Sequence, residues 1–335
     1  MTRYIIRRLL QAIPLLLLIT FILFVLLRSM GDPLAAYTGR HRMRPEDRAR
    51  LRVVLGLDKP IYVQYGVWLK DMATGNWGFS VDTHEPVTEM IGQRLPNTLL
   101  LMLVTEVVIL VFSLVLGIYS ALRQYSLMDQ TLTAFSFIGY SMPIFWLALM
   151  LIYIFAVRFK AWGLPYLPTG GVYTLSLVEV GRKPSSFLGV TYATIPDLLK
   201  HMIMPVIAMS TISIAGYSRY VRSTMLAVIN EDYIRTARAK GLPERLILLR
   251  HALKNASLPL VTLIGLDMPF LLGGAIVTET IFSWPGMGRL FWNQVSKGDY
   301  PVVMAILLII SVAVIVFQLL TDIAYTALDP RIRYE

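Results

Sequence analysis

Long apolar stretches constrain the fold of this 335-residue chain more than any other feature of its sequence. Hydrophobic residues make up 56% of the chain and charged residues only 16%, and the mean hydropathy is +0.62. So little polar surface cannot cover such a composition in water, whereas a helix of about 20 apolar residues crosses a bilayer. The composition therefore predicts an all-α polytopic membrane protein in contact with membrane lipid.

The first predicted membrane-spanning helix lies within residues 1–30. Three arginines precede an apolar run from Leu9 to Leu27, as in a signal peptide. This run of 19 residues is longer than the apolar region of most signal peptides, so we expect a retained helix and not a leader cleaved near Ala35. Hydropathy places five further spans at residues 98–122, 131–157, 202–218, 258–281 and 302–320.

Polar stretches between the predicted spans set the domain organisation. Residues 31–97 are too many for a simple loop and predict a small helical extracytoplasmic insert, with helices at 45–55 and 60–72. A second polar stretch, residues 158–200, is also expected outside, followed later by an outer turn at 282–300. Six spans place both termini on the same side.

Residues 219–257 form the charged segment that orients the chain. This short stretch contains eight Lys and Arg residues but only three acidic residues, and the excess of positive charge predicts a cytoplasmic location. The N-terminus and the tail at 321–335 are then cytoplasmic as well. The net charge of +10 is explained in the same way, and we do not expect nucleic acid as a partner.

Two short helices that meet at a glycine are predicted within residues 230–259. Asn230 is expected to cap the first helix by accepting hydrogen bonds from free backbone N–H groups. Gly241 is expected to end that helix, and Pro243 is well placed to begin the next one. The pair would form a compact knob at the membrane surface.

Two residues stand out within the predicted spans. Asp267 places a carboxyl in the fifth span, at a cost of about 2.5–3.5 kcal/mol unless it is paired, protonated or exposed to water. It either lines the route of a solute or pairs with a neighbouring helix, and the sequence leaves both open. Pro143 is expected to kink the third span, because it removes a backbone hydrogen bond.

Motifs of reaction chemistry are absent from the sequence. There is no GxxxxGK[ST], GxSxG or HExxH, the chain has no cysteine, and its four histidines lie far apart. We therefore predict no catalytic residues, no metal ligands and no cofactor in this chain, which is expected to be a non-catalytic subunit.

Several motifs in order resemble one family. The segment DYIRTARAKGL (Asp232–Leu242), followed by RHALKNASLP (Arg250–Pro259), resembles the cytoplasmic loop of permease subunits of dipeptide and oligopeptide ABC importers. The resemblance continues in LGLDKPIYVQYGVWL (Leu55–Leu69), RLPNTLLL (Arg94–Leu101), SMPIFWLAL (Ser141–Leu149), ETIFSWPGMGRL (Glu279–Leu290), DYPVV (Asp299–Val303) and ALDPRIR (Ala327–Arg333).

This resemblance implies a type I ABC importer permease fold with its core at residues 98–335, in the cytoplasmic membrane of a prokaryote. It implies a second, homologous permease subunit, two ATPase subunits that bind ATP and Mg, and an extracytoplasmic substrate-binding protein. The loop at 219–257 would then couple the chain to an ATPase through Asp232, Tyr233, Arg235, Thr236, Ala237, Arg238, Lys240 and Gly241. Peptides would cross along a pathway that includes Asp267, Pro143 and Ser141.

The sequence departs from the general importer pattern at two places. That pattern begins Glu-Ala-Ala, where this chain has Arg235, Thr236 and Ala237, so the salt-bridge role of the glutamate does not transfer. Asp267 stands where an uncharged residue such as Gln is expected. Three alternatives stay open: a proton-coupled secondary transporter that uses Asp267, a membrane receptor or scaffold, and an importer of the same family for nickel chelates or oligosaccharides.

Overall fold

The computed structural model describes residues 2–30, 34, 44–175, 185–187, 189–256 and 258–328. Within these ranges the regular elements are helices and one antiparallel hairpin, in which Ser186 lies opposite Thr191. The elements are α1 (Thr2–Met30), α3 (Pro45–Val54), α4 (Ile61–Ala73), α5 (Val87–Leu122), α6 (Leu127–Ser141), α7 (Ile144–Leu151), the π-helical η1 (Ile152–Arg158), α8 (Phe159–Ala161), β1 (Ser185–Phe187), β2 (Val190–Tyr192), α10 (Ile195–Ile229), α11 (Asp232–Ala239), α12 (Glu244–Leu246), the π-helical η2 (Ile247–Ala252), α13 (Leu253–Ala256), α14 (Leu258–Gly274), α15 (Ile276–Ile281), α16 (Met287–Lys297) and α17 (Tyr300–Leu328).

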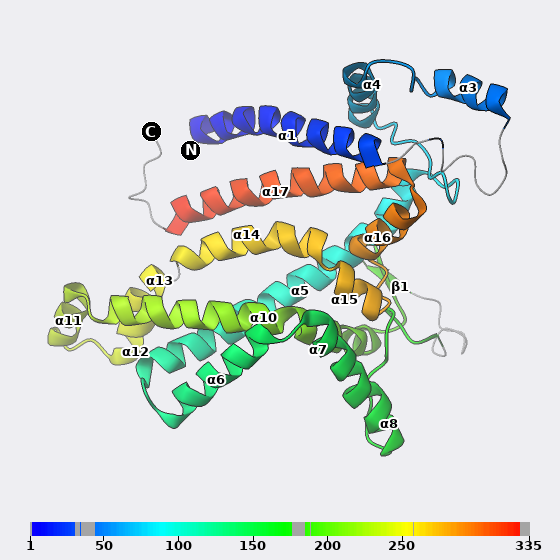
Figure 1. The fold of residues 1–335 in the computed structure, drawn as a ribbon. Coiled ribbons are helices and arrows are strands. Elements are labelled where there is room, and N and C mark those ends of the chain that lie inside the picture. The colour runs from blue at the N-terminus through cyan, green and yellow to red at the C-terminus, as the bar shows by residue number, and fades with distance from the viewer. Residues whose placement is uncertain are drawn as a thin grey trace.

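Five helical stretches in the described residues are long and apolar enough to cross a membrane. They are Ile6–Ser29, Val87–Leu122, Ile144–Ala161, Ile195–Ile229 and Tyr300–Ala324. The apolar part of α14 is shorter, Leu260–Pro269. Figure 1 shows α1, α17, α14 and α10 as successive rods, and the start of α1, the end of α17 and α11 lie at one end of the bundle. The insert helices α3 and α4 lie at the other end.

The packing of α5 against α10 forms the centre of the bundle. A Cβ on Gly117 of α5 would lie 2.6 Å from the Cβ of Val221 on α10, so only glycine permits this approach. Around this contact, Ile109 and Met225 are fully buried. The two helices therefore form a close-packed pair from which the neighbouring elements extend.

Three predicted spans are longer as helices than hydropathy indicates. Helix α5 begins at Val87 rather than residue 98, α10 covers 195–229 rather than 202–218, and α17 continues to Leu328. Hydropathy ends a span at its first charges, but two of these charges, both on α10, have partners. Asp197 accepts hydrogen bonds from the backbone N–H and hydroxyl of Thr174, at 2.8 and 2.7 Å, and Arg222 pairs with Asp129 at 2.9 Å. The helices therefore continue through them.

The third and fifth predicted spans are each divided into separate helices. In the third, α6 ends at Ser141 and α7 begins at Ile144, so Pro143 marks a break and not the expected kink. Met142 is extended, at φ −82° and ψ 123°, as is typical before proline. In the fifth, α14 ends at Gly274 and α15 follows from Ile276. The predicted outer turn at 282–300 contains a further helix, α16.

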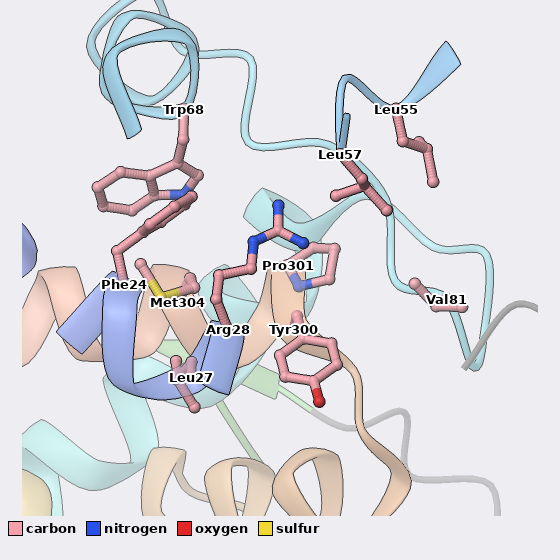
Figure 2. A pocket seen from close by; sticks show the side chains of 10 residues that line it. All are labelled: Phe24, Leu27, Arg28, Leu55, Leu57, Trp68, Val81, Tyr300, Pro301 and Met304. Carbon is pink, nitrogen blue, oxygen red and sulfur yellow. The ribbon is translucent and has the colours of Figure 1, made fainter. Parts of the chain in front are cut away.

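The insert helices form as predicted, α3 over 45–54 and α4 over 61–73. Helix α4 contacts α1, because the hydroxyl of Tyr65 donates to the carbonyl of Leu17 at 3.0 Å and its ring meets Phe21 edge-on. A mostly apolar cavity of about 140 Å³ lies between the end of α1, the insert and the start of α17, and Figure 2 shows the side chains that line it. Phe24, Arg28, Trp68 and Met304 are among the residues that line it.

Candidate functional site

The knob, residues 230–256, is packed firmly onto the bundle. Helix α11 turns Ile234 and Ala237 inward, and these side chains are 0% and 8% exposed. They belong to one apolar cluster with Ile247 and Ala252 of η2 and with Val221 of α10. Because closely packed helices move as bodies, a force on α11 would be transmitted to the long helices α5 and α10.

The first turn of the knob differs from the prediction. Helix α10 continues to Ile229, so Asn230 ends that helix and its Nδ2 donates to the carbonyl of Leu226 at 2.9 Å. Glu231 stands at the N-cap of α11 and makes no capping hydrogen bond through its side chain. The prediction that Asn230 caps α11 is wrong, and the loop expected from residue 219 begins only at 230.

The corner between the two knob helices is formed by Gly241, as predicted. Its φ is +74°, and its N–H donates to the carbonyl of Arg238 at 2.9 Å. A left-handed residue after the last helical turn is the common way to end a helix, and glycine adopts it without strain. Pro243 then takes the N-cap position of α12, as its place in the sequence indicates.

An ion pair connects the two knob helices across this corner. Arg238 donates to Glu244 through Nη2 at 2.7 Å and through Nε at 3.2 Å. This hydrogen bonding holds the pKa of Glu244 below its ordinary value. Both side chains are about half exposed, so solvent screening limits the stabilisation to about 1 kcal/mol or less.

The predicted coupling residues divide into an exposed set and a packed one. The side chains of Asp232 and Arg235 are 95% and 71% exposed, and Thr236, Lys240 and Gly241 also lie on the surface. Tyr233 is exposed, and its hydroxyl accepts a hydrogen bond from Asn255 at 2.8 Å. Ala237 instead packs inward, so its place is in the core of the knob.

A second candidate site lies inside the bundle, at Asp267 on α14. The hydroxyl of Tyr217 donates to Asp267 Oδ2 at 2.8 Å, and the hydroxyl of Ser213 approaches the same oxygen at 3.5 Å. Both donors come from α10. Of the two interpretations that the sequence left open, pairing with a neighbouring helix is therefore observed, while a role in a solute route stays a prediction.

Sequence reasoning missed a second buried acid, Glu106 on α5. This side chain is 4% exposed and its carboxyl oxygens make no hydrogen bond within the described residues. Ile109, three residues later on α5, packs in one apolar cluster with Ile264, three residues before Asp267 on α14. The signal was present as a single acid in the apolar run LVTEVVIL (Leu103–Leu110). Nothing in the sequence indicates that this run faces Asp267, because the two acids are far apart along the chain.

Ser141 and Pro143 lie elsewhere, at the break between α6 and α7. Ser141 Oγ donates to the carbonyl of Phe137 at 2.8 Å within its own helix. An open hollow of about 570 Å³ lies beside them, with the aromatic rings of Phe137, Phe145 and Trp146 among its walls. Asp267 is not among the residues that line this hollow, and in the described part of the chain no hydrogen bond joins it to Ser141 or Pro143.

The helical fold and the packed knob are those of a membrane component of a transport system. Residues 113–334 match the family described as binding-protein-dependent transport system inner membrane component, and residues 1–102 match the family for its N-terminal part. The chain belongs to this family. It is thus a non-catalytic, multi-pass subunit of the bacterial inner membrane, in a system that includes a binding protein and an ATPase.

Curated relatives match over the whole length. The chain is 44% identical over 336 residues to the oligopeptide transport system permease protein AppB of Bacillus subtilis, with 100% of both chains covered. It is 38% identical over 342 residues to the dipeptide transport system permease protein DppB of Escherichia coli, again with 100% of both covered. A putative peptide permease protein of Brucella suis is 41% identical, with 99% of each chain covered.

One solved structure supports the fold. A chain of the methionine ABC transporter MetNI in inward-facing conformations is similar with a TM-score of 0.54 at 17% identity. The match covers 73% of this chain and 99% of that one. The helical arrangement is therefore that of an ABC importer permease.

Proposed function

We propose that the chain forms half of the membrane pathway of an ATP-driven peptide importer. A second, homologous permease subunit forms the other half, and two ATPase subunits bind from the cytoplasm. The relatives that match its whole length are named as oligopeptide and dipeptide permeases, which supports peptides over nickel chelates or oligosaccharides as cargo. A separate binding protein delivers the peptide from outside.

In this proposal the chain spans the membrane six times, with α6–α8 and α14–α15 as its two broken spans. The start of α1, the end of α17 and the knob lie at one end of the bundle, which supports placing them together in the cytoplasm (Figure 1). The insert, at the other end, then faces the binding protein. Its contacts with α1 and α17 hold it against the membrane-spanning helices.

The observation that carries the proposal is the construction of the knob. Its inner face is buried against α5 and α10, while its outer face presents Asp232, Arg235 and Lys240 to a partner. An exposed surface on a firmly packed base is what a subunit without its own nucleotide site needs to receive motion from an ATPase. The hollow at Ser141 and Pro143 and the site at Asp267 are the proposed pathway surfaces.

Co-purification and uptake test this function. We expect the detergent-solubilised chain to bring down a second permease and an ATPase, and proteoliposomes of the complex to import a labelled tripeptide only when ATP is present. The Asp267→Asn variant should retain ATP-dependent uptake, although at a lower rate. Uptake driven by a proton gradient without ATP would instead support the secondary transporter, and a chain that brings down neither partner would be a receptor or scaffold.

Charge reversal on the knob separates partner binding from knob stability. We expect Arg235→Glu to weaken ATPase binding, with an effect that shrinks as salt is raised. Arg235 is exposed, and its ion pair with Asp232, the one it makes among the described residues, is 3.5 Å long. Affinity of the complex at two salt concentrations is the measurement. Unchanged affinity at low salt would remove the electrostatic part of the docking model.

Arg238→Glu is the comparison variant. This substitution breaks the ion pair with Glu244 and leaves two acidic side chains on opposite sides of the Gly241 corner. Part of any loss of ATPase binding would therefore come from a less stable knob. Adding Glu244→Arg restores an opposite-charge pair in reversed order. Recovery in that double variant would assign Arg238 to the knob's own stability.

A further inference from the structure

Three helices of the bundle bring polar side chains together around Asp267. Glu106 comes from α5, Ser213 and Tyr217 from α10, and Asp267 itself from α14. Ile109, three residues after Glu106, and Ile264, three residues before Asp267, pack in one apolar cluster with Tyr217, and no hydrogen bond joins the two acids. We call these four residues the acidic cluster.

The hydrogen bonds of the acidic cluster are incomplete. Both hydroxyl donors approach Oδ2 of Asp267, and within the described residues none reaches Oδ1. The side chain of Glu106 is 4% exposed, and both of its carboxyl oxygens are buried without a donor. Buried carboxyl oxygens are almost always hydrogen-bonded, so an unsatisfied pair indicates a missing donor.

The cluster also has no positive charge of its own. In the described part of the chain, no Lys or Arg forms an ion pair with Glu106 or Asp267. Two carboxyls at this depth repel each other if both are ionised, and burial makes each negative charge costly. A cation that donates hydrogen bonds would lower both costs. Its positive charge balances one ionised carboxylate, and the second carboxyl stays protonated and neutral.

We propose that Glu106 and Asp267 bind the primary ammonium group of the substrate as it crosses the membrane. An ammonium has three donors and no acceptor, which suits the unsatisfied oxygens of Glu106, the free Oδ1 of Asp267 and the hydroxyl oxygen of Ser213. Tyr217 has a positioning role, since its hydroxyl fixes the orientation of the Asp267 carboxyl.

The position of the cluster fits a passing group. Asp267 is only partly buried, whereas Glu106 is 4% exposed, so a ligand would reach Glu106 past Asp267. A free carboxylate would be repelled there, so the cluster distinguishes the two ends of a peptide. This inference rests on the proposed function, in which the substrate is a peptide; its ammonium comes from the amino terminus or from a lysine side chain.

Binding of three peptides tests the inference without interference from the binding protein. The chain, its partner permease and the ATPases are placed in nanodiscs, and equilibrium binding of labelled trialanine, N-acetyl-trialanine and N-acetyl-Ala-Lys-Ala is measured. We expect the wild type to bind trialanine about tenfold more tightly than N-acetyl-trialanine, as for one lost charge-assisted hydrogen bond. Glu106→Gln and Asp267→Asn should each reduce the ratio of the two affinities to about one, because the preference for the free amine is lost.

The third peptide identifies the source of the ammonium. Tight binding of N-acetyl-Ala-Lys-Ala that is lost in both variants assigns the site to any primary ammonium, and weak binding restricts it to the amino terminus. Ser311→Ala, on α17, is the matched control, because its hydroxyl donates only within its own helix, to the carbonyl of Leu307 at 2.8 Å. This variant should behave as the wild type.

Equal binding of trialanine and its acetylated form by the wild type would overturn the inference. A preference for the free amine that persists in both variants would also overturn the inference. The role of Glu106 and Asp267 would then be limited to sharing a proton between α5 and α14. ATP-driven uptake by the complete complex distinguishes a failure of the ammonium site from a failure of the proposed importer function. If the wild type imports trialanine with ATP but the variants show no amine effect, only the ammonium site is rejected.

Discussion

Gly241→Val is expected to abolish ATP-driven uptake while the protein still inserts into the membrane and folds. Gly241 has φ +74°, a conformation that costs a non-glycine residue about 1–2 kcal/mol and a β-branched one more. A Cβ at this position would meet nothing within 4 Å, so the chain itself has room for a side chain. The strain therefore acts on the corner of the knob. We expect ATP hydrolysis by the complex to continue without transport, measured as the ratio of peptide imported to ATP consumed.

Gly241→Asn is the matched control, because asparagine adopts the left-handed conformation more readily than valine. Normal coupling in Gly241→Asn would assign the loss in Gly241→Val to the backbone of the corner. Uncoupling in both variants would show that any side chain here obstructs the partner surface. Normal coupling in Gly241→Val itself would contradict the role of the knob in transmitting motion.

Glu279→Ala is expected to give the largest loss of stability. Glu279 on α15 is 0% exposed and accepts from the hydroxyl of Thr98 on α5 at 2.7 Å and from the backbone N–H of Arg289 on α16 at 2.8 Å. The hydroxyl of Thr98 in turn accepts from the N–H of Met287 at 2.7 Å. Each buried donor left without a partner costs about 1–3 kcal/mol, so we expect a total loss of about 3–5 kcal/mol.

Thermal unfolding in detergent, followed by tryptophan fluorescence, measures this effect. Trp284 is a suitable reporter, because its ring is fully buried beside this network and its Nε1 donates to the carbonyl of Asn97 at 3.1 Å. Asp82→Asn is the matched control on the same side of the molecule. Asp82 pairs with Lys297 at 2.6 Å, but both side chains are partly exposed, so the change should cost less than about 1 kcal/mol. Equal stability of the two variants would show that Glu279 does not hold α5, α15 and α16 together.

Local features of the sequence predicted the helical class and the knob because their physical causes are local. An apolar stretch of about 20 residues needs a bilayer whatever surrounds it. In the same way, Gly241 ends a helix through its own backbone freedom, and Pro243 begins the next through its fixed φ. The insert helices α3 and α4 were placed within about a turn for the same reason.

Predictions of where a membrane span ends failed where a residue far away in the sequence keeps the helix going. Hydropathy ended the fourth span at residue 218, but Arg222 stays helical because Asp129, from α6, neutralises it. A sequence window around Arg222 does not contain Asp129, which is 93 residues away along the chain. The cap assigned to Asn230 failed for a different reason, since α10 continues to Ile229 and Asn230 lies at the end of that helix.

The sequence by itself determined that this chain crosses a membrane many times, that it exposes a charged knob, and that it carries no nucleotide motif of its own. Its motifs also placed it in the correct family. Only the tertiary structure showed that Glu106 is buried on a helix that packs against the helix of Asp267, that Ala237 packs inside the knob, and that Glu279 joins α5 to α16. The physical reason is that composition, helix ends and charge density are properties of neighbouring residues, whereas burial and pairing depend on which distant segments pack together.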